Sequence, residues 1–110
     1  MERLTEQDIV ETFAYYHRSM LRRLLEEDMF YGQAEKVGWN RDGSFDMAME
    51  NLITLNWERY TYTGEEFLRL MEKAGKRYDR EHPGEEEETA ELHRQMVEKA
   101  AKKQADSAAL

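Results

Sequence analysis

The chain has 110 residues, of which 36% are charged, and its formal net charge is −8 at pH 7. A chain of this length forms one domain around one modest core. The excess of acid argues against direct nucleic-acid binding, because such binding needs a basic surface. The sequence has no cysteine, which excludes a disulfide scaffold, a thiol nucleophile and cysteine-based metal sites.

Long apolar segments are also missing from the sequence. No apolar run is long enough to cross a membrane, and no early run has the pattern of a secretory signal. We therefore expect a cytoplasmic protein that does not contact membranes. The single proline and the 6 glycines favour helices over many short strands joined by turns.

The first predicted element is a long amphipathic helix over residues 6–30. Thr5 is a suitable N-cap, and Asp8 places acid in the first turn. Apolar residues then recur at helical spacing over about half of the helix surface: Ile9, Val10, Phe13, Ala14, Tyr16, Met20, Leu21, Leu24 and Leu25. The following residues, 31–44, contain several glycines and are predicted to form a loop.

A second helix is predicted over residues 44–60, with Ser44 as its N-cap. Its apolar positions form a broad arc on the helical wheel: Phe45, Ala48, Met49, Leu52, Ile53, Leu55, Trp57 and Tyr60. An arc of this width indicates a central helix that is contacted on two sides.

Two more helices are predicted in the last part of the chain. Thr63 and Glu66 have capping-box spacing, which indicates a helix at about residues 65–80. A proline and a glycine then mark a boundary, and residues 85–105 favour a further helix by their composition. The apolar face of this last helix is thin.

Together these elements predict an all-α fold, a small bundle of three amphipathic helices plus a thinner C-terminal helix. Residues 1–82 would form the three-helix core domain. Residues 83–110 would form an acidic-to-basic helix that is either packed on the core or extended.

Residues 37–50 space their oxygen atoms almost as a calcium-binding loop does. The oxygen-bearing side chains surround Gly43: Asn40, Asp42, Asp46 and Glu50. However, Gly38 and Met49 occupy the first and last ligand positions, where carboxylates are needed. No phosphate-binding glycine loop or nucleophile motif is present either. We therefore expect no metal site, no cofactor and no catalytic residue.

Two polar residues interrupt the apolar arcs of the predicted helices. His17 falls within the arc of the first helix and Asn56 within that of the second. A buried polar group without a partner costs about 1–3 kcal/mol, so we expect structural hydrogen bonds inside the core. The alternative is that both residues line a small pocket or a polar spot in a dimer interface.

Six further residues are candidates for partner contacts. Aromatic residues cluster near both ends of the second predicted helix: Trp39, Trp57, Tyr60 and Tyr62. Tyrosine and tryptophan dominate binding hot spots, although core packing is the competing explanation. Arg18 and Arg22 lie on the polar face of the first helix, either as part of a mixed surface or as a contact for an acidic partner.

These features favour a small non-enzymatic protein-interaction protein, such as an accessory subunit, adaptor or regulator. Self-association as a dimer is expected, because the apolar arcs of the first two helices exceed what a small core needs. An acidic inhibitor or nucleic-acid mimic, of the kind that phages and mobile elements encode, stays open as an alternative, although the acids are dispersed along the chain. A helical metal-dependent hydrolase is the third possibility.

Overall fold

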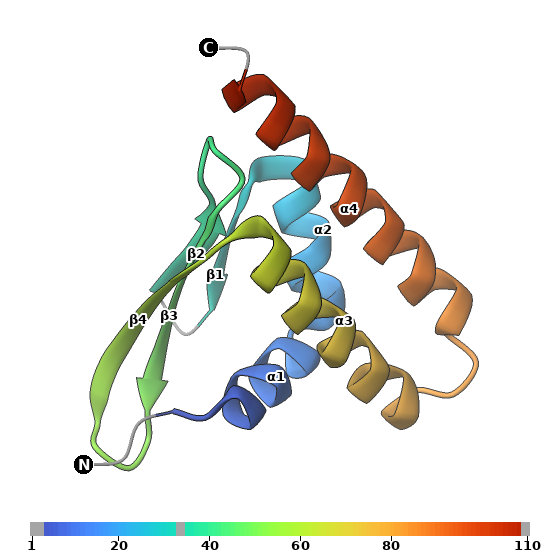
Figure 1. Cartoon of the computed structure of the whole chain (residues 1–110). Helices are drawn as coiled ribbons and strands as arrows, with labels where there is room; N and C mark the ends of the chain where they lie inside the picture. Colours follow the sequence, from blue (N-terminus) through green and yellow to red (C-terminus); the bar gives the residue numbers. More distant parts are fainter. Residues whose placement is uncertain (1–3, 33–34, 109–110) are drawn as a thin grey trace.

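The computed structural model describes residues 4–32 and 35–108, and its fold is mixed α/β (Figure 1). The helices are α1 (Glu6–Tyr15), α2 (His17–Glu27), α3 (Gly64–Glu81) and α4 (Glu86–Ala108). The strands are β1 (Met29–Gly32), β2 (Glu35–Trp39), β3 (Phe45–Asn51) and β4 (Asn56–Tyr62). The all-α bundle predicted from the sequence is therefore wrong, because a four-stranded antiparallel sheet forms the middle of the chain.

Each strand pairs with the next strand along the chain, so the order across the sheet is β1-β2-β3-β4. The longest pairing joins β3 to β4, from Phe45 opposite Tyr62 to Asn51 opposite Asn56. Figure 1 shows the four helices on one side of the sheet, with β4 at its outer edge. In the part of the chain that the structure describes, no helix covers the other face of the sheet.

The helix predicted over residues 44–60 is a β-hairpin in the structure, and this prediction is wrong. Phe45, Met47 and Met49 are buried on the inner face of β3, while the intervening Asp46 is exposed. This period of two is the period of a strand. Phe45 and Met49 also fall on one side of a helical wheel together with Ala48 and Leu52, so part of the apolar spacing fits both elements, whereas Met47 fits the strand only.

The turn between β2 and β3 shows why Ser44 does not begin a helix. The backbone N–H of Asn40 donates to the carbonyl oxygen of Ser44 over 2.8 Å, and that of Gly43 donates to Asn40 over 3.1 Å. Asp42 Oδ1 accepts from the Ser44 N–H over 2.9 Å. Gly43 has a φ of 91°, a conformation that glycine adopts readily. Asp42-Gly43 therefore closes a hairpin instead of capping a helix.

The first predicted helix is correct at its start but wrong in its continuity and its end. Thr5 forms a capping box with Asp8 at the start of α1. The helix is interrupted at Tyr16, whose ψ of 5° lies outside the α region, so α1 and α2 are separate helices. Asp28 ends α2 with a φ of 63°, and Met29 already belongs to β1.

The last two helices are confirmed. Thr63 and Glu66 form the expected capping box at the start of α3. α4 buries Leu92, Met96 and Ala100, and it packs against α2 and α3. Figure 1 shows α4 running along the side of the molecule opposite the sheet.

The core lies between the inner face of the sheet and the helices. Phe45 of β3 stacks on Phe67 of α3, with ring centroids 3.8 Å apart and planes at 10°. Phe13 of α1 and Trp39 of β2 pack against the same Phe67 ring edge-to-face, at centroid distances of 6.2 and 5.2 Å. This aromatic cluster holds α1 beside the inner face of the sheet.

Candidate functional site

Three large aliphatic side chains are exposed on the turn between β3 and β4. Leu52 and Ile53 are each 74% exposed, and Leu55 is 71% exposed. We call these three residues the apolar turn. Single exposed apolar residues are ordinary, but several on one short segment mark an interaction site more often than a free surface.

The backbone of this turn is fixed by Asn51, which is only 2% exposed. Its side-chain oxygen accepts from the backbone N–H groups of Ile53 and Thr54, over 3.0 and 3.2 Å. The backbone carbonyl oxygen of Asn51 accepts from the Leu55 N–H over 2.7 Å. Because Asn51 satisfies these donors from inside, the apolar side chains project away from the core.

Leu55 adopts the left-handed backbone region, with a φ of 60°. This conformation costs a residue with a side chain roughly 1–2 kcal/mol relative to the right-handed region. Glycine or asparagine would be the ordinary residue here. A bulky leucine therefore combines backbone strain with an exposed apolar surface at one position.

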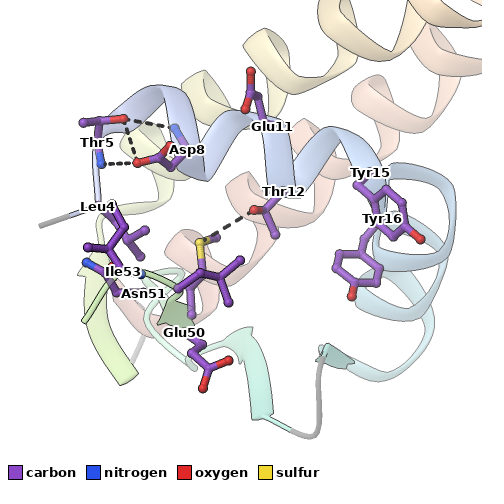
Figure 2. A pocket seen from close by; sticks show the side chains of 12 residues that line it. Leu4, Thr5, Asp8, Glu11, Thr12, Tyr15, Tyr16, Glu50, Asn51 and Ile53 are labelled. Atoms are coloured by element: carbon purple, nitrogen blue, oxygen red, sulfur yellow. Dashed lines mark hydrogen bonds between the residues drawn. The ribbon is translucent and has the colours of Figure 1, made fainter. Parts of the chain in front are cut away.

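A groove of about 770 Å³ runs beside the apolar turn, between α1 and the end of β3 (Figure 2). Its described lining residues belong to α1 and its flanks, to β3 and to the turn: Leu4, Thr5, Asp8, Glu11, Thr12, Tyr15, Tyr16, Met49, Glu50, Asn51, Leu52 and Ile53. This volume lies within the range of sites that bind a small ligand or a few side chains of a partner.

The walls of the groove are held in place by contacts of the fold. Thr12 of α1 lies 3.7 Å from the sulfur of Met49 on β3, which joins the two walls. At one end Tyr15 is 82% exposed and packs edge-to-face on Tyr16, with ring centroids 4.9 Å apart. Figure 2 shows this tyrosine pair at the end of the groove opposite Leu4.

The charge of the groove has one sign. Asp8, Glu11 and Glu50 line it, and its described lining contains no lysine, arginine or histidine. In Figure 2 the carboxylates of Glu11 and Glu50 point away from each other: Glu11 is bound to Arg77 over 3.3 Å, and Glu50 shares the outer face of the sheet with Trp57. The apolar part of the lining comes from Leu4, Met49, Leu52 and Ile53.

A second hollow, of about 340 Å³, lies on another face of α1 and has the opposite charge. Lys73, Lys76, Arg77 and Arg80 of α3 line it. Arg77 reaches Glu11 over 3.3 Å, so the two hollows share one ion pair at their boundary. The basic residues of this hollow all belong to α3, whereas α1 contributes Glu6, which pairs with Lys73.

Among the residues that the sequence singled out, His17 lies in the core and is 2% exposed. Its ring stacks on Tyr78, with centroids 5.0 Å apart. Burial, aided by the nearby charge of Arg18, lowers the pKa of His17 to about 4. Its buried Nδ1 atom has no hydrogen-bond partner among the described residues.

Asn56 is exposed, and it is the first residue of β4. The helix whose apolar arc would have buried it does not form. The backbone N–H of Asn56 donates to the side-chain oxygen of Thr54 over 3.4 Å. The buried asparagine of this hairpin is Asn51, which pairs with Asn56 in the strand register. His17 and Asn56 therefore lie in different environments, His17 in the core and Asn56 on the surface.

The four candidate aromatic residues have different environments. Trp39 is 7% exposed and belongs to the core, whereas Trp57 is 36% exposed on the outer face of β4, opposite Glu50. Tyr60 and Tyr62 are half-buried and stacked, with centroids 6.1 Å apart. Burial raises the pKa of Tyr62 to about 12.

Arg18 and Arg22 contact acidic residues of the same chain. The Arg18 side chain is 13% exposed, and it binds Glu85 over 3.2 Å and Glu88 over 3.3 Å. Arg22 binds Glu88 over 2.7 Å. The acidic partner of these arginines is therefore the start of α4 and the residue before it, and the ion pairs neutralise part of the longest acidic run in the sequence.

In residues 37–50, which resemble a calcium-binding loop in their spacing, two acidic side chains make hydrogen bonds within the sheet and its turn. Asp42 binds Ser44, and Asp46 accepts from the Thr61 hydroxyl over 2.8 Å. Within residues 4–32 and 35–108, no group of three or more histidine or acidic side chains is arranged to hold a metal. Over the same residues, no helix has the length and apolar character needed to span a membrane.

Comparison with known proteins gives no family for this chain. No family model, curated protein or solved structure matches it. The candidate site therefore depends on the geometry of the apolar turn and the groove alone. Sequence reasoning missed both, because it assigned Leu52, Ile53 and Leu55 to the buried arc of a helix.

Proposed function

We propose that this protein binds another protein through the apolar turn and the adjoining groove, as a non-enzymatic accessory subunit, adaptor or regulator. The observation that carries the proposal is the exposure of Leu52, Ile53 and Leu55, each above 70%, on one turn. Burying such side chains in an interface would provide about 25 cal/mol for each Å² of apolar surface removed from water.

The strain at Leu55 supports the same proposal. Both its left-handed backbone and its exposed side chain disfavour the isolated folded state. Neither feature contributes to the core, so a role in folding does not account for them. Backbone strain of this kind is common at sites that contact ligands and partners.

The expectation of a dimer loses one of its two supports. That expectation depended on the apolar arcs of the helices predicted at residues 6–30 and 44–60, and residues 44–60 instead contain β3, β4 and the turn between them. The apolar residues of β3 are used in the core. We therefore propose a different protein as the partner, in the cytoplasm, and a second copy of this chain becomes an outcome that an experiment can detect.

Nucleic-acid mimicry receives less support from the geometry. The acidic block at Glu85 to Glu88 contributes two of its carboxylates to ion pairs with Arg18 and Arg22. A mimic needs unpaired acids along one face, because these must replace the phosphates of the nucleic acid. Internal pairing at the longest acidic run works against that requirement.

A comparative capture experiment tests the proposal. Tagged wild-type protein and the double variant Leu52→Ser/Ile53→Ser are each incubated with a lysate of the native host. Val97→Ser is the matched control, because Val97 is an exposed aliphatic residue on α4, at 42%. We expect the wild type and the control to retain the same protein and the double variant to lose it, with equal melting temperatures. Equal capture by all three proteins contradicts the proposal.

A further inference from the structure

We infer that an extended segment of the partner protein pairs with an open edge of β3 in the groove, as an additional strand of the sheet. This inference rests on the proposed function, since it names the form of the partner at the same site. Its basis is the register of the sheet. Among the described residues, β2 pairs with β3 only where Gly38 lies opposite Asp46 and Trp39 opposite Phe45. β4 pairs with β3 over its whole length, so β3 has one open edge, on the side of β2, after Asp46.

The alternation of the strand assigns two residues to this open edge. The Asn40 N–H donates to the carbonyl oxygen of Ser44 over 2.8 Å, so Ser44 faces β2. In an antiparallel ladder every second residue turns its N–H and C=O to the same neighbour, so Ala48 and Glu50 face that side as well. The register with β4 is unbroken, so no bulge shifts this alternation. The backbone groups of Ala48 and Glu50 therefore point to the open edge, while the Glu50 side chain lies on the outer face.

Two neighbouring hollows lie along this edge. The groove is lined by Met49, Glu50 and the apolar turn, so it reaches the end of β3. A smaller hollow of about 30 Å³ is lined by Val37 of β2 and Ala48 of β3, so it lies between these two strands. Thr12 and Met49 line both hollows. A strand beside β3 would therefore fit into the groove at Glu50, whereas the smaller hollow must widen to admit it at Ala48.

The β1–β2 hairpin is held by the helices and not by this part of β3. Phe30 of β1 packs on Tyr16, with ring centroids 5.5 Å apart, and Val37 of β2 is buried in the core. These contacts fix the hairpin without a register that reaches Ala48 or Glu50. The open edge of β3 therefore stays available to another chain.

Backbone hydrogen bonding favours an extended segment over a helix at this edge. A helix pairs its own N–H and C=O groups and would cover those of Ala48 and Glu50 without binding them, which is costly. An extended segment pairs with them, and strand addition of this kind is a common mode of peptide recognition. Its side chains beside Met49 would face Tyr16 and the groove, whereas the next ones would face the outer side of the sheet. The occupant is therefore an extended segment with apolar residues at every second position.

Amide hydrogen exchange of the free protein tests the open edge. By the alternation of β3, Met47 and Met49 face β4, so they are internal controls for Ala48 and Glu50. We expect Ala48 and Glu50 to exchange about tenfold faster or more, after correction for the intrinsic rate of each amide. Equal protection of all four amides would show that the edge is closed, and it would overturn the inference.

Two short synthetic peptides with the same side chains test the occupant on the full chain. Both alternate valine and threonine, and the second carries N-methyl groups on the residues whose N–H would face β3. We expect the first to bind in fluorescence anisotropy and N-methylation to weaken its affinity by about tenfold or more. The bound peptide should slow exchange at Glu50 more than at Ala48 and leave Met47 and Met49 unchanged. Equal binding of both peptides, binding of neither, or protection at a different strand edge overturns the inference.

The outcomes separate this inference from the proposed function. If the peptides overturn strand addition while host capture still depends on Leu52 and Ile53, the protein-binding function stands with a partner that docks through its side chains only. If the amides of Ala48 and Glu50 become protected as the free protein is concentrated, the occupant is a second copy of this chain. The inference of a partner segment is overturned in that case too.

Discussion

The side-chain amide of Asn51 on β3 donates a hydrogen bond of 2.6 Å to the carboxylate of Glu58 on β4. The other side of the same amide accepts from two backbone N–H groups of the apolar turn. One buried side chain therefore links the strand pair to the conformation of the turn. The candidate site depends on this residue although a partner would not contact it.

Replacing Asn51 by alanine should destabilise the protein by about 1–3 kcal/mol, because the turn loses its acceptor and Glu58 loses a donor inside the fold. Urea unfolding at pH 7 measures this loss. Asn51→Ala should also increase amide hydrogen exchange at Ile53 and Thr54, whose N–H groups the side chain binds. Asn56→Ala is the matched control, since Asn56 is the exposed register partner, and it should change stability by about 0.5 kcal/mol or less. Equal effects of the two variants would disprove the structural role of Asn51.

Replacing Leu55 by glycine should separate stability from binding. Glycine adopts the φ of 60° without strain, so we expect a gain of about 0.5–1 kcal/mol after its greater freedom in the unfolded chain is considered. The same change should weaken capture of the partner, because an exposed aliphatic side chain is lost. Leu52→Gly is the control, since Leu52 has no positive φ, and it should reduce capture without raising stability. If unfolding curves show that Leu55→Gly is less stable than the wild type, the left-handed backbone of Leu55 is not strained.

The C-terminal half of the chain could be predicted because its signals are local. The capping box of Thr63 and Glu66, the helix-favouring composition of α4 and the break before it depend on neighbouring residues only. The segment from Phe45 to Tyr62 could not be decided in this way. Part of its apolar spacing fits both a period of two and a helical arc, and only pairing between distant residues favours the sheet.

Two cues, one just before that segment and one inside it, nevertheless favoured strands. Asp42-Gly43 is a common hairpin turn, and the aromatic and β-branched residues of β4, such as Tyr60 and Thr61, are typical of strands. The apolar turn was harder to foresee. Exposure of Leu52 and its neighbours follows from the tertiary arrangement, and a sequence pattern reports only that these residues are apolar.

The buried imidazole of His17 predicts a dependence of stability on pH. The pKa of His17 is lowered from 6.5 to about 4 in the fold, mainly because burial disfavours the charged ring. The unfolded chain therefore binds the proton first as the pH falls. Above about pH 6.5 the ring is neutral in both states, and His17 has its full effect on the free energy of unfolding. Between about pH 6.5 and pH 4 this free energy should fall progressively, by about 3 kcal/mol, because only the unfolded chain takes up the proton.

Comparison with His17→Gln isolates this effect from the carboxylates that also titrate in acid. Urea midpoints of both proteins are measured from pH 7.5 to pH 4, and the difference between them should shrink as the pH falls. Asp79, Arg18 and His93 act on the charge of the ring, so they stay unchanged in the variant. A difference that is constant over this pH range would show that His17 does not take up its proton in this way.

Arg18 and Arg22 should contribute very differently to stability. Arg18 is largely buried and donates to Tyr78, Glu85 and the backbone before α4, so Arg18→Gln should cost about 1–3 kcal/mol. Arg22 is 59% exposed, and Arg22→Gln should cost about 0.5 kcal/mol or less. Thermal unfolding of both variants measures the contrast. Similar losses would show that Arg18 does not hold α2 to α3 and α4.

Photo-crosslinking from the apolar turn tests the protein-binding function most directly. A photoreactive phenylalanine derivative replaces Ile53 in one protein and Val97 in another, both exposed apolar positions, and each protein is irradiated in cells of the native host. We expect one heavier adduct of this chain with a different protein from position 53 and none from position 97. No adduct from position 53, or the same adducts from both positions, would contradict that function.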